Sequence, residues 1–95
     1  IECGEVVLNL NDTSVAVRGE KIDLTKNEFL ILKTLMEKQG KVVSREEIME
    51  RLWGNDEFVD DNTLTVTMKR LREKLNHPAC LKTIRSFGYR MEDTQ

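Results

Sequence analysis

The fold is decided by Asp60-Asp61-Asn62-Thr63-Leu64-Thr65-Val66-Thr67-Met68-Lys69-Arg70-Leu71-Arg72-Glu73-Lys74-Leu75. At about 100° per residue, the large apolar side chains of this stretch fall on one narrow stripe, which must pack on a core. They are Leu64, Met68, Leu71 and Leu75. Asp60 can cap the N-terminus, and Asp61 suits the positive end of the helix dipole. We therefore expect a helix over residues 61–75.

The opposite face of this helix mixes cations with small apolar groups. Val66 and Thr67 lie among Lys69 and Arg70, whereas an ordinary solvated helix would present a mixture of Glu and Lys. In a DNA major groove, Arg and Lys reach guanine edges or phosphates, and small apolar groups touch thymine methyls. The composition therefore favours DNA recognition, with a solvated basic helix as the alternative interpretation.

Two earlier helix starts carry the capping-box signature, in which a Ser or Thr and a Glu three residues later satisfy backbone N–H groups. Thr25-Lys26-Asn27-Glu28 is expected to begin a helix that stops at Gly40. Ser44-Arg45-Glu46-Glu47 is expected to begin a shorter helix that Gly54 ends. Three helices are therefore predicted in total.

Strands are predicted at both ends of the chain. Apolar residues alternate over 6–10 and 15–17, which indicates short antiparallel strands that pack on the helices or on a neighbouring domain and carry no chemistry. Residues 81–85 and 88–91 alternate around a tight turn at Ser86-Phe87 and predict a two-stranded basic hairpin. Three helices followed by such a hairpin describe an α+β winged helix-turn-helix, in which one helix enters the major groove and the wing follows the backbone or the adjacent minor groove.

The net charge of −2 hides an uneven distribution. Residues 62–91 hold seven cations against one acid, while residues 1–61 hold eight cations against fourteen acids. A basic end can therefore sit on phosphates although the overall pI is about 5.5. Non-specific affinity for nucleic acid is expected to be modest and strongly salt-dependent.

Length and composition limit the remaining classes. The 95 residues, 39% of them hydrophobic, suffice for one core and predict a single domain over 1–95. No membrane-length apolar run or signal peptide is present, which predicts a cytoplasmic protein. Cys3 and Cys80 lie outside any Cys/His cluster, so we expect free thiols and no metal. A lone His77 and the lack of a glycine-rich phosphate loop argue against an enzyme or a cofactor.

Over essentially its whole length the chain resembles the effector domain of OmpR/PhoB-type response regulators. The motifs that carry the resemblance are Leu24-Thr25-x-x-Glu28-Phe29-x-Ile31-Leu32, Ser44-Arg45-Glu46-x-Ile48-x-x-x-Leu52-Trp53-Gly54, Arg70-Leu71-Arg72-x-Lys74-Leu75 and Thr83-Ile84-Arg85-x-x-Gly88-Tyr89-Arg90. The resemblance implies a four-stranded N-terminal sheet, three helices and a hairpin wing. It also implies sequence-specific binding of double-stranded DNA by the output domain of a two-component system. Ser86 departs from the Gly that the family usually has, so the wing turn is expected to differ.

Carried over by position, the resemblance assigns contacts with DNA. Val66 and Arg70 are the expected base-reading residues. Contacts with phosphates or base edges are expected from the helix residues Asn62, Thr63, Thr67, Lys69 and Arg72, from the wing residues Thr83 and Arg85, and from Trp53. For Trp53 a core position is the alternative. For Arg72 an intramolecular ion pair is the alternative.

The resemblance implies further partners besides promoter DNA. A receiver domain, absent from this chain, would be phosphorylated by a histidine kinase and dimerise, placing two effector domains on half-sites about one helical turn apart. Loop 53–59 would meet RNA polymerase, with a solvated connector as the alternative. Residues 58–66 look like the BceR and GraR subgroup, which responds to antimicrobial peptides, so resistance genes would be the targets.

Two other functions stay open because a fold does not fix a function. A protein-interaction module should carry an apolar patch in place of Lys69, Arg70 and Arg72. An RNA-binding module should expose more aromatic side chains than Phe87 and Tyr89, and we expect Tyr89 to lie in the core.

Overall fold

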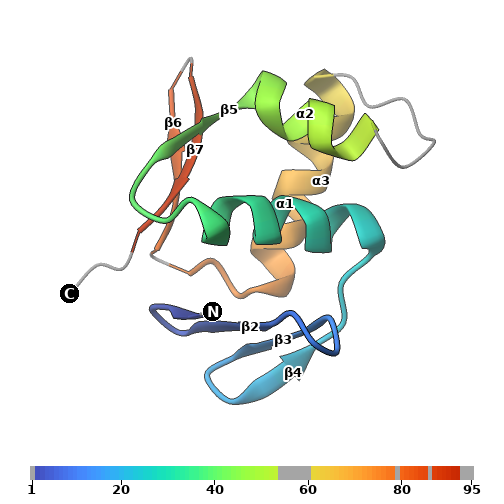
Figure 1. Ribbon diagram of the computed structural model, residues 1–95, viewed down its shortest axis with the longest axis vertical. Helices are drawn as coiled ribbons and strands as arrows, with labels where there is room; N and C mark the ends of the chain where they lie inside the picture. Colours follow the sequence, from blue (N-terminus) through green and yellow to red (C-terminus); the bar gives the residue numbers. More distant parts are fainter. Residues whose placement is uncertain (1, 54–60, 79, 86, 93–95) are drawn as a thin grey trace.

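The computed structural model describes residues 2–53, 61–78, 80–85 and 87–92. In chain order the elements are β1 (Glu2–Cys3), β2 (Val6–Asn9), β3 (Ser14–Val17), β4 (Glu20–Ile22), α1 (Lys26–Glu37), β5 (Val42–Ser44), α2 (Arg45–Trp53), α3 (Asp61–Lys74), β6 (Leu81–Ile84) and β7 (Gly88–Met91). The three helices lie against two antiparallel sheets, with the N-terminal sheet below them and the sheet of β5, β6 and β7 at their left side in Figure 1. This is the predicted α+β arrangement.

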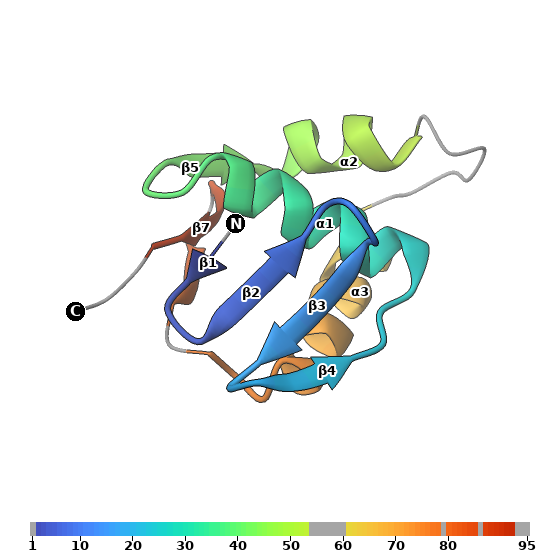
Figure 2. The same cartoon turned by 60° about the horizontal axis from the view of Figure 1, so that its bottom comes forward.

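The N-terminal sheet has the strand order β1-β2-β3-β4, and Figure 2 shows it lying across α1 and α3. Val6 pairs with Val17 and Leu8 pairs with Val15, and all four side chains are buried because alternate residues of a strand share one face. The expectation that the first strand extends to Leu10 was wrong. The strand ends at Asn9, whose Oδ1 accepts the N–H of Asn11 (3.0 Å), so the chain turns and leaves Leu10 43% exposed.

The core is formed by the apolar faces of the three helices together with the inner faces of the sheets. The stripe predicted for the last helix is confirmed, since Leu64, Leu71 and Leu75 are fully buried and Met68 is 2% exposed. The stripe packs α3 against α1 and α2, and this contact fixes which face of α3 points outward.

The ends of α1 and α3 follow local sequence signals. The capping box at the start of α1 is confirmed: the Glu28 N–H donates to Thr25 Oγ1 (3.3 Å), and the Thr25 N–H donates to Glu28 Oε1 (2.8 Å). At the end of α3 the Asn76 N–H donates to the Glu73 carbonyl (3.1 Å) and the His77 N–H donates to the Arg72 carbonyl (2.8 Å). This is a Schellman motif, with Asn76 at φ 61°. The predicted cap Asp60 and the predicted stop Gly54 lie outside the described residues.

The second sheet carries the wing and has the strand order β5-β7-β6. The predicted hairpin is present, but the expectation of two strands was incomplete because β5 pairs with β7 as a third. The pairing places the backbone of Val43 very close to Gly88. A Cβ atom on Gly88 would lie 2.0 Å from the Val43 carbonyl oxygen, so only glycine allows β5 to approach.

Candidate nucleic-acid interface

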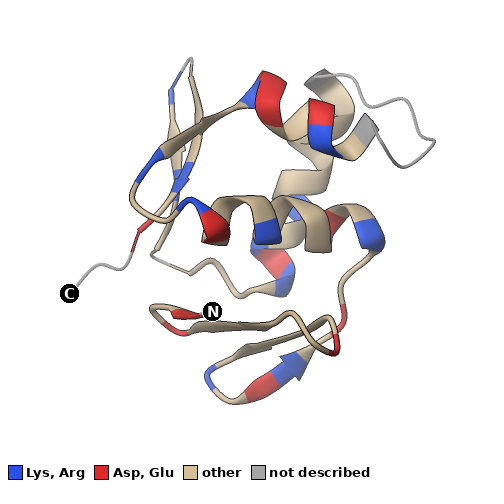
Figure 3. Ribbon diagram, in the orientation of Figure 1, with Lys and Arg blue, Asp and Glu red and all other residues tan. Residues whose placement is uncertain are grey.

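Cations gather at the end of the molecule formed by α3 and the wing sheet. Figure 3 shows Lys and Arg on the wing strands and on α3, while the N-terminal sheet and its turns carry most of their charge as Asp and Glu. Glu73 is the one acid between residues 62 and 91. A surface of this polarity attracts phosphates at one end and repels them at the other.

The outer face of α3 presents the side chains that the helical angles predicted to be outside. Val66 is 42% exposed, and Asn62, Thr63, Lys69 and Arg70 are exposed as well. Thr67 is half-buried and its hydroxyl donates to the Thr63 carbonyl (2.8 Å), so it can offer DNA its methyl group and a hydroxyl oxygen that still accepts hydrogen bonds. The face therefore offers one apolar spot flanked by hydroxyls and cations, as a major groove requires.

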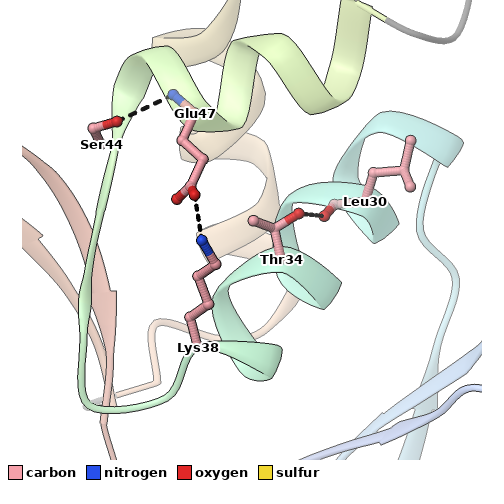
Figure 4. A network of polar contacts seen from close by, with 5 residues as sticks. All are labelled: Leu30, Thr34, Lys38, Ser44 and Glu47. Atoms are coloured by element: carbon pink, nitrogen blue, oxygen red, sulfur yellow. Dashed lines mark hydrogen bonds and ion pairs between the residues drawn. The ribbon is translucent and has the colours of Figure 1, made fainter.

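Helix α2 is fixed at its N-terminus by side chains from two elements (Figure 4). Ser44 Oγ accepts the Glu47 N–H (3.1 Å), so the predicted cap is present. The Glu47 carboxylate makes an ion pair with Lys38 at the end of α1. Together these contacts hold the first turn of α2 in place, and Arg45 begins that turn.

Arg45 joins three elements, a role that its place in the sequence did not predict. Its Nη1 donates to the Tyr89 hydroxyl (2.8 Å) on β7, and its Nη2 donates to Thr65 Oγ1 (2.7 Å) on α3. Its Cζ lies 5.8 Å from the centre of the Tyr89 ring. No local signal distinguishes it, because Lys26 at the first position of α1 is also a cation that opposes its helix dipole.

Arg72 is held by the wing. Its Nη2 donates to Thr83 Oγ1 on β6, and its Cζ lies 5.8 Å from the centre of the Tyr89 ring. These intramolecular partners are a hydroxyl and an aromatic ring, so they are not the ion pair that was the alternative interpretation, and the predicted phosphate contact stays a prediction. Tyr89 is 4% exposed, as expected for a core residue.

A hollow of about 470 Å³ lies between α3 and the wing. It is lined by Arg45, Thr65, Met68, Lys69, Arg72, Glu73, His77, Thr83 and Tyr89. Guanidinium and ammonium groups from two helices meet hydroxyl groups here, a combination that suits the oxygens of a phosphate backbone.

The other residues predicted to contact DNA belong to the wing and to the end of α2. Thr83 and Arg85 are exposed on the wing, and Phe87 beside the turn is 69% exposed. Trp53 is the last residue of α2, and its side chain lies outside the described part of the chain, so neither interpretation of it is decided. Residues 54–60 of the predicted polymerase loop, and Ser86 in the wing turn, also lie outside it.

Other kinds of site find no support among the described residues. No group of three or more His, Cys, Asp or Glu side chains there is placed to hold a metal ion. No described helix is long and apolar enough to cross a bilayer. Cys3 and Cys80 are both buried and not joined in a disulfide, and the Cys80 thiol donates to the Cys3 carbonyl (3.4 Å).

Sequence comparison identifies relatives over most of the chain. The family described as "Transcriptional regulatory protein, C terminal" matches residues 19–91. The sensory transduction protein BceR of Bacillus subtilis is 56% identical over 74 residues, which cover 78% of this chain and 32% of BceR. RegX3 of Mycolicibacterium smegmatis is 38% identical over 96 residues, covering 97% of this chain and 42% of RegX3. The chain thus spans well under half the length of these relatives.

Solved structures match the fold over its full extent. The DNA-binding domain of RstA from Klebsiella pneumoniae, solved in complex with the RstA box, superposes with a TM-score of 0.84 at 27% identity and covers 99% of this chain and 97% of that one. The C-terminal domain of the nisin resistance regulator NsrR, a lantibiotic response regulator, gives 0.82 at 33% identity, with coverages of 99% and 98%. These relatives are DNA-binding transcription regulators and not enzymes. The chain therefore belongs to the family of winged helix-turn-helix DNA-binding domains of OmpR/PhoB-type response regulators.

Proposed function

We propose that the domain recognises promoter DNA with α3 in the major groove and the β6–β7 hairpin along the adjacent backbone or minor groove. The observation that carries this proposal is the exposed face of α3, where Val66 stands among Lys69 and Arg70 beside a wing of the same charge. A protein-interaction module would present a larger apolar patch on that face. The cations there therefore favour DNA over a protein partner.

The side chains of this interface are proposed to have two roles, reading bases and contacting phosphates. Val66 and Arg70 are proposed to read bases, through a thymine methyl and through guanine N7 and O6. Contacts with phosphates or base edges are proposed for Asn62, Thr63, Thr67, Lys69, Arg72, Thr83, Arg85 and Trp53. Because Arg72 and Thr83 already contact each other, they are proposed to act on the backbone as one unit.

Arg70→Ala is expected to weaken binding to the cognate site by about 1–3 kcal/mol and to relax preference at one base pair, because a bidentate contact is lost. The measurement is fluorescence anisotropy with the DNA upstream of the protein's own gene and with a scrambled duplex. Lys21→Ala, which removes an exposed cation from the N-terminal sheet, is the matched control. An equal loss on both duplexes would reassign Arg70 to phosphate, and absence of wild-type binding at low salt would reject the proposed function.

Arg85→Ala is expected to weaken binding to cognate and scrambled DNA alike, because a wing cation on a phosphate carries no sequence information. The slope of log K against log salt concentration should become shallower by about 1. The same titrations, repeated at several salt concentrations, supply the measurement. A loss confined to the cognate duplex would make Arg85 a base-reading residue instead.

The intact regulator is proposed to place two such domains on DNA. By analogy with the relatives, a receiver domain phosphorylated by a histidine kinase would dimerise and present them to tandem half-sites, so affinity would be higher than for one domain. Contact of loop 53–59 with RNA polymerase, and action in the bacterial cytoplasm, belong to the same proposal.

The target genes are proposed to protect the cell against antimicrobial peptides. Two similarities support this proposal: 56% identity with BceR over 74 residues, and 33% identity with NsrR, whose described role is nisin resistance.

A further inference from the structure

Arg45 occupies a position in α2 where its positive charge is unfavourable. The guanidinium belongs to the first residue of α2, where the helix dipole is positive and a cation is disfavoured. Ser44, Glu46 and Glu47 around it follow the ordinary preferences of a helix start. The side-chain hydrogen bonds of Arg45 are made to residues outside α2.

The contacts of Arg45 connect α3 with the wing. Nη1 donates to the Tyr89 hydroxyl at 2.8 Å, and Nη2 donates to Thr65 Oγ1 at 2.7 Å. The planar guanidinium holds both hydroxyls at once, which fixes their separation. The backbone of Arg45 also contacts the wing, since its N–H donates to the Phe87 carbonyl beside the wing turn (3.3 Å).

Tyr89 extends this connection to the other wing strand. The Cζ atoms of Arg45 and Arg72 each lie 5.8 Å from its ring centre, and Arg72 donates in turn to Thr83 on β6. A continuous series of contacts thus runs from Thr65 on α3, through Arg45 and Tyr89, back to Arg72 on α3 and on to Thr83 on β6. Tyr89 is buried, so the middle of the series is anchored in the core, while the bonds of Arg45 to Thr65 and of Arg72 to Thr83 lie at the surface.

We propose that Arg45 is a positioning residue for DNA recognition, which holds the wing at a fixed distance from α3 so that both reach their grooves together. This inference rests on the proposed function. Arg45 acts here through Thr65 and Tyr89, and the proposal assigns it no contact with a phosphate.

The first test uses the protein without DNA. In Arg45→Ala, amide relaxation-dispersion NMR is expected to show new microsecond-to-millisecond exchange in β6 and β7, because the wing has lost a restraint. Lys26→Ala is the matched control, since Lys26 is likewise the first residue of a helix. Thermal unfolding by circular dichroism confirms that both variants are folded. Wing amides that behave as in the wild type would overturn the proposal, whatever the protein binds.

The second test measures recognition. Arg45→Ala and Tyr89→Phe are each expected to weaken cognate binding about tenfold, and the double variant no further than Arg45→Ala, because both remove the same contact. The salt slope should match that of the wild type. Arg45→Lys should not restore affinity, since an ammonium cannot hold two hydroxyls as a planar fork does.

The outcomes separate the two proposals. Additive losses, or a salt slope reduced by about 1 with equal loss on scrambled DNA, would make Arg45 a direct phosphate contact and overturn the positioning role. Wild-type protein that shows no preference for the cognate duplex would reject the proposed function itself. In that case the NMR result still decides whether Arg45 restrains the wing.

Discussion

Gly88→Ala is expected to lower the free energy of unfolding by about 3 kcal/mol or more, toward the upper end for overpacked sites. The added Cβ would lie 2.0 Å from the Val43 carbonyl oxygen and 2.9 Å from Ser44 Cα, and both belong to the backbone. No rotamer change relieves such a contact, so β5 must move away from β7. DNA binding should fall as well, because Ser44 ends β5 and Arg45 follows it directly.

Urea unfolding followed by circular dichroism measures this effect, and Gly40→Ala is the matched control. Gly40 has φ +82°, a conformation that costs alanine about 1–2 kcal/mol, yet a Cβ there meets nothing within 4 Å. The control therefore carries the backbone strain without the clash. If both variants lost the same stability, close approach of β5 would not be the reason for glycine at position 88.

Glu28→Ala is expected to cost about 2–4 kcal/mol at neutral pH. The carboxylate is 2% exposed and accepts hydrogen bonds from the Thr25 N–H (2.8 Å) and from Lys74 Nζ (2.6 Å), so it caps α1 and connects it to α3. Loss of a helix cap costs about 1 kcal/mol, and breaking a buried pair costs up to about 3–5 kcal/mol. The Lys74 side chain is 38% exposed, so the ion pair contributes less than that upper value.

The same carboxylate predicts how stability depends on pH. Burial alone would raise the pKa of Glu28, but hydrogen bonds from Lys74 and Thr25 outweigh it and lower the pKa below its ordinary value of 4.5. A carboxyl with a lowered pKa in the folded state stabilises the fold above its unfolded pKa, and the contribution is lost as the pH falls through the folded value. Wild-type stability should therefore drop below about pH 4.5, and Glu28→Gln should flatten that part of the curve.

Glu5→Ala is the control for both measurements. Its ion pair with Arg18 has a comparable length of 2.7 Å, but the two side chains are 52% and 60% exposed. A surface pair of this kind contributes about 0–1 kcal/mol. Equal losses for Glu5→Ala and Glu28→Ala would show that burial does not strengthen the Glu28 contacts.

Local features of the fold could be predicted because their causes lie within a few residues. Thr25 and Glu28 form a capping box from their own spacing, and the helical angles alone predicted that Val66 and Arg70 are exposed on α3. Strand β5 escaped prediction because its three residues become a strand only by pairing with β7, more than forty residues later. Val43 is buried and Val42 is 46% exposed although both are apolar, so the segment shows no alternation of apolar and polar residues that could have revealed it.

Arg45 escaped prediction for a related reason. Its partners Thr65 and Tyr89 lie 20 and 44 residues away, so the helical angles and capping signals around Arg45 contain no trace of them. Which side chains α3 exposes follows from the helix alone, whereas the contacts that join α3 to the wing depend on the whole fold.

Strand β5 has a consequence for the DNA. It pairs with β7 and leads directly into α2, so the wing is part of the body of the domain and not a hinged arm. When such a rigid surface binds, it is the DNA duplex that must change shape. Bending or twisting DNA costs free energy that depends on its sequence and is lowest at pyrimidine–purine steps. Base pairs lying between the helix contact and the wing contact are therefore expected to affect affinity through their flexibility, even where no side chain touches them.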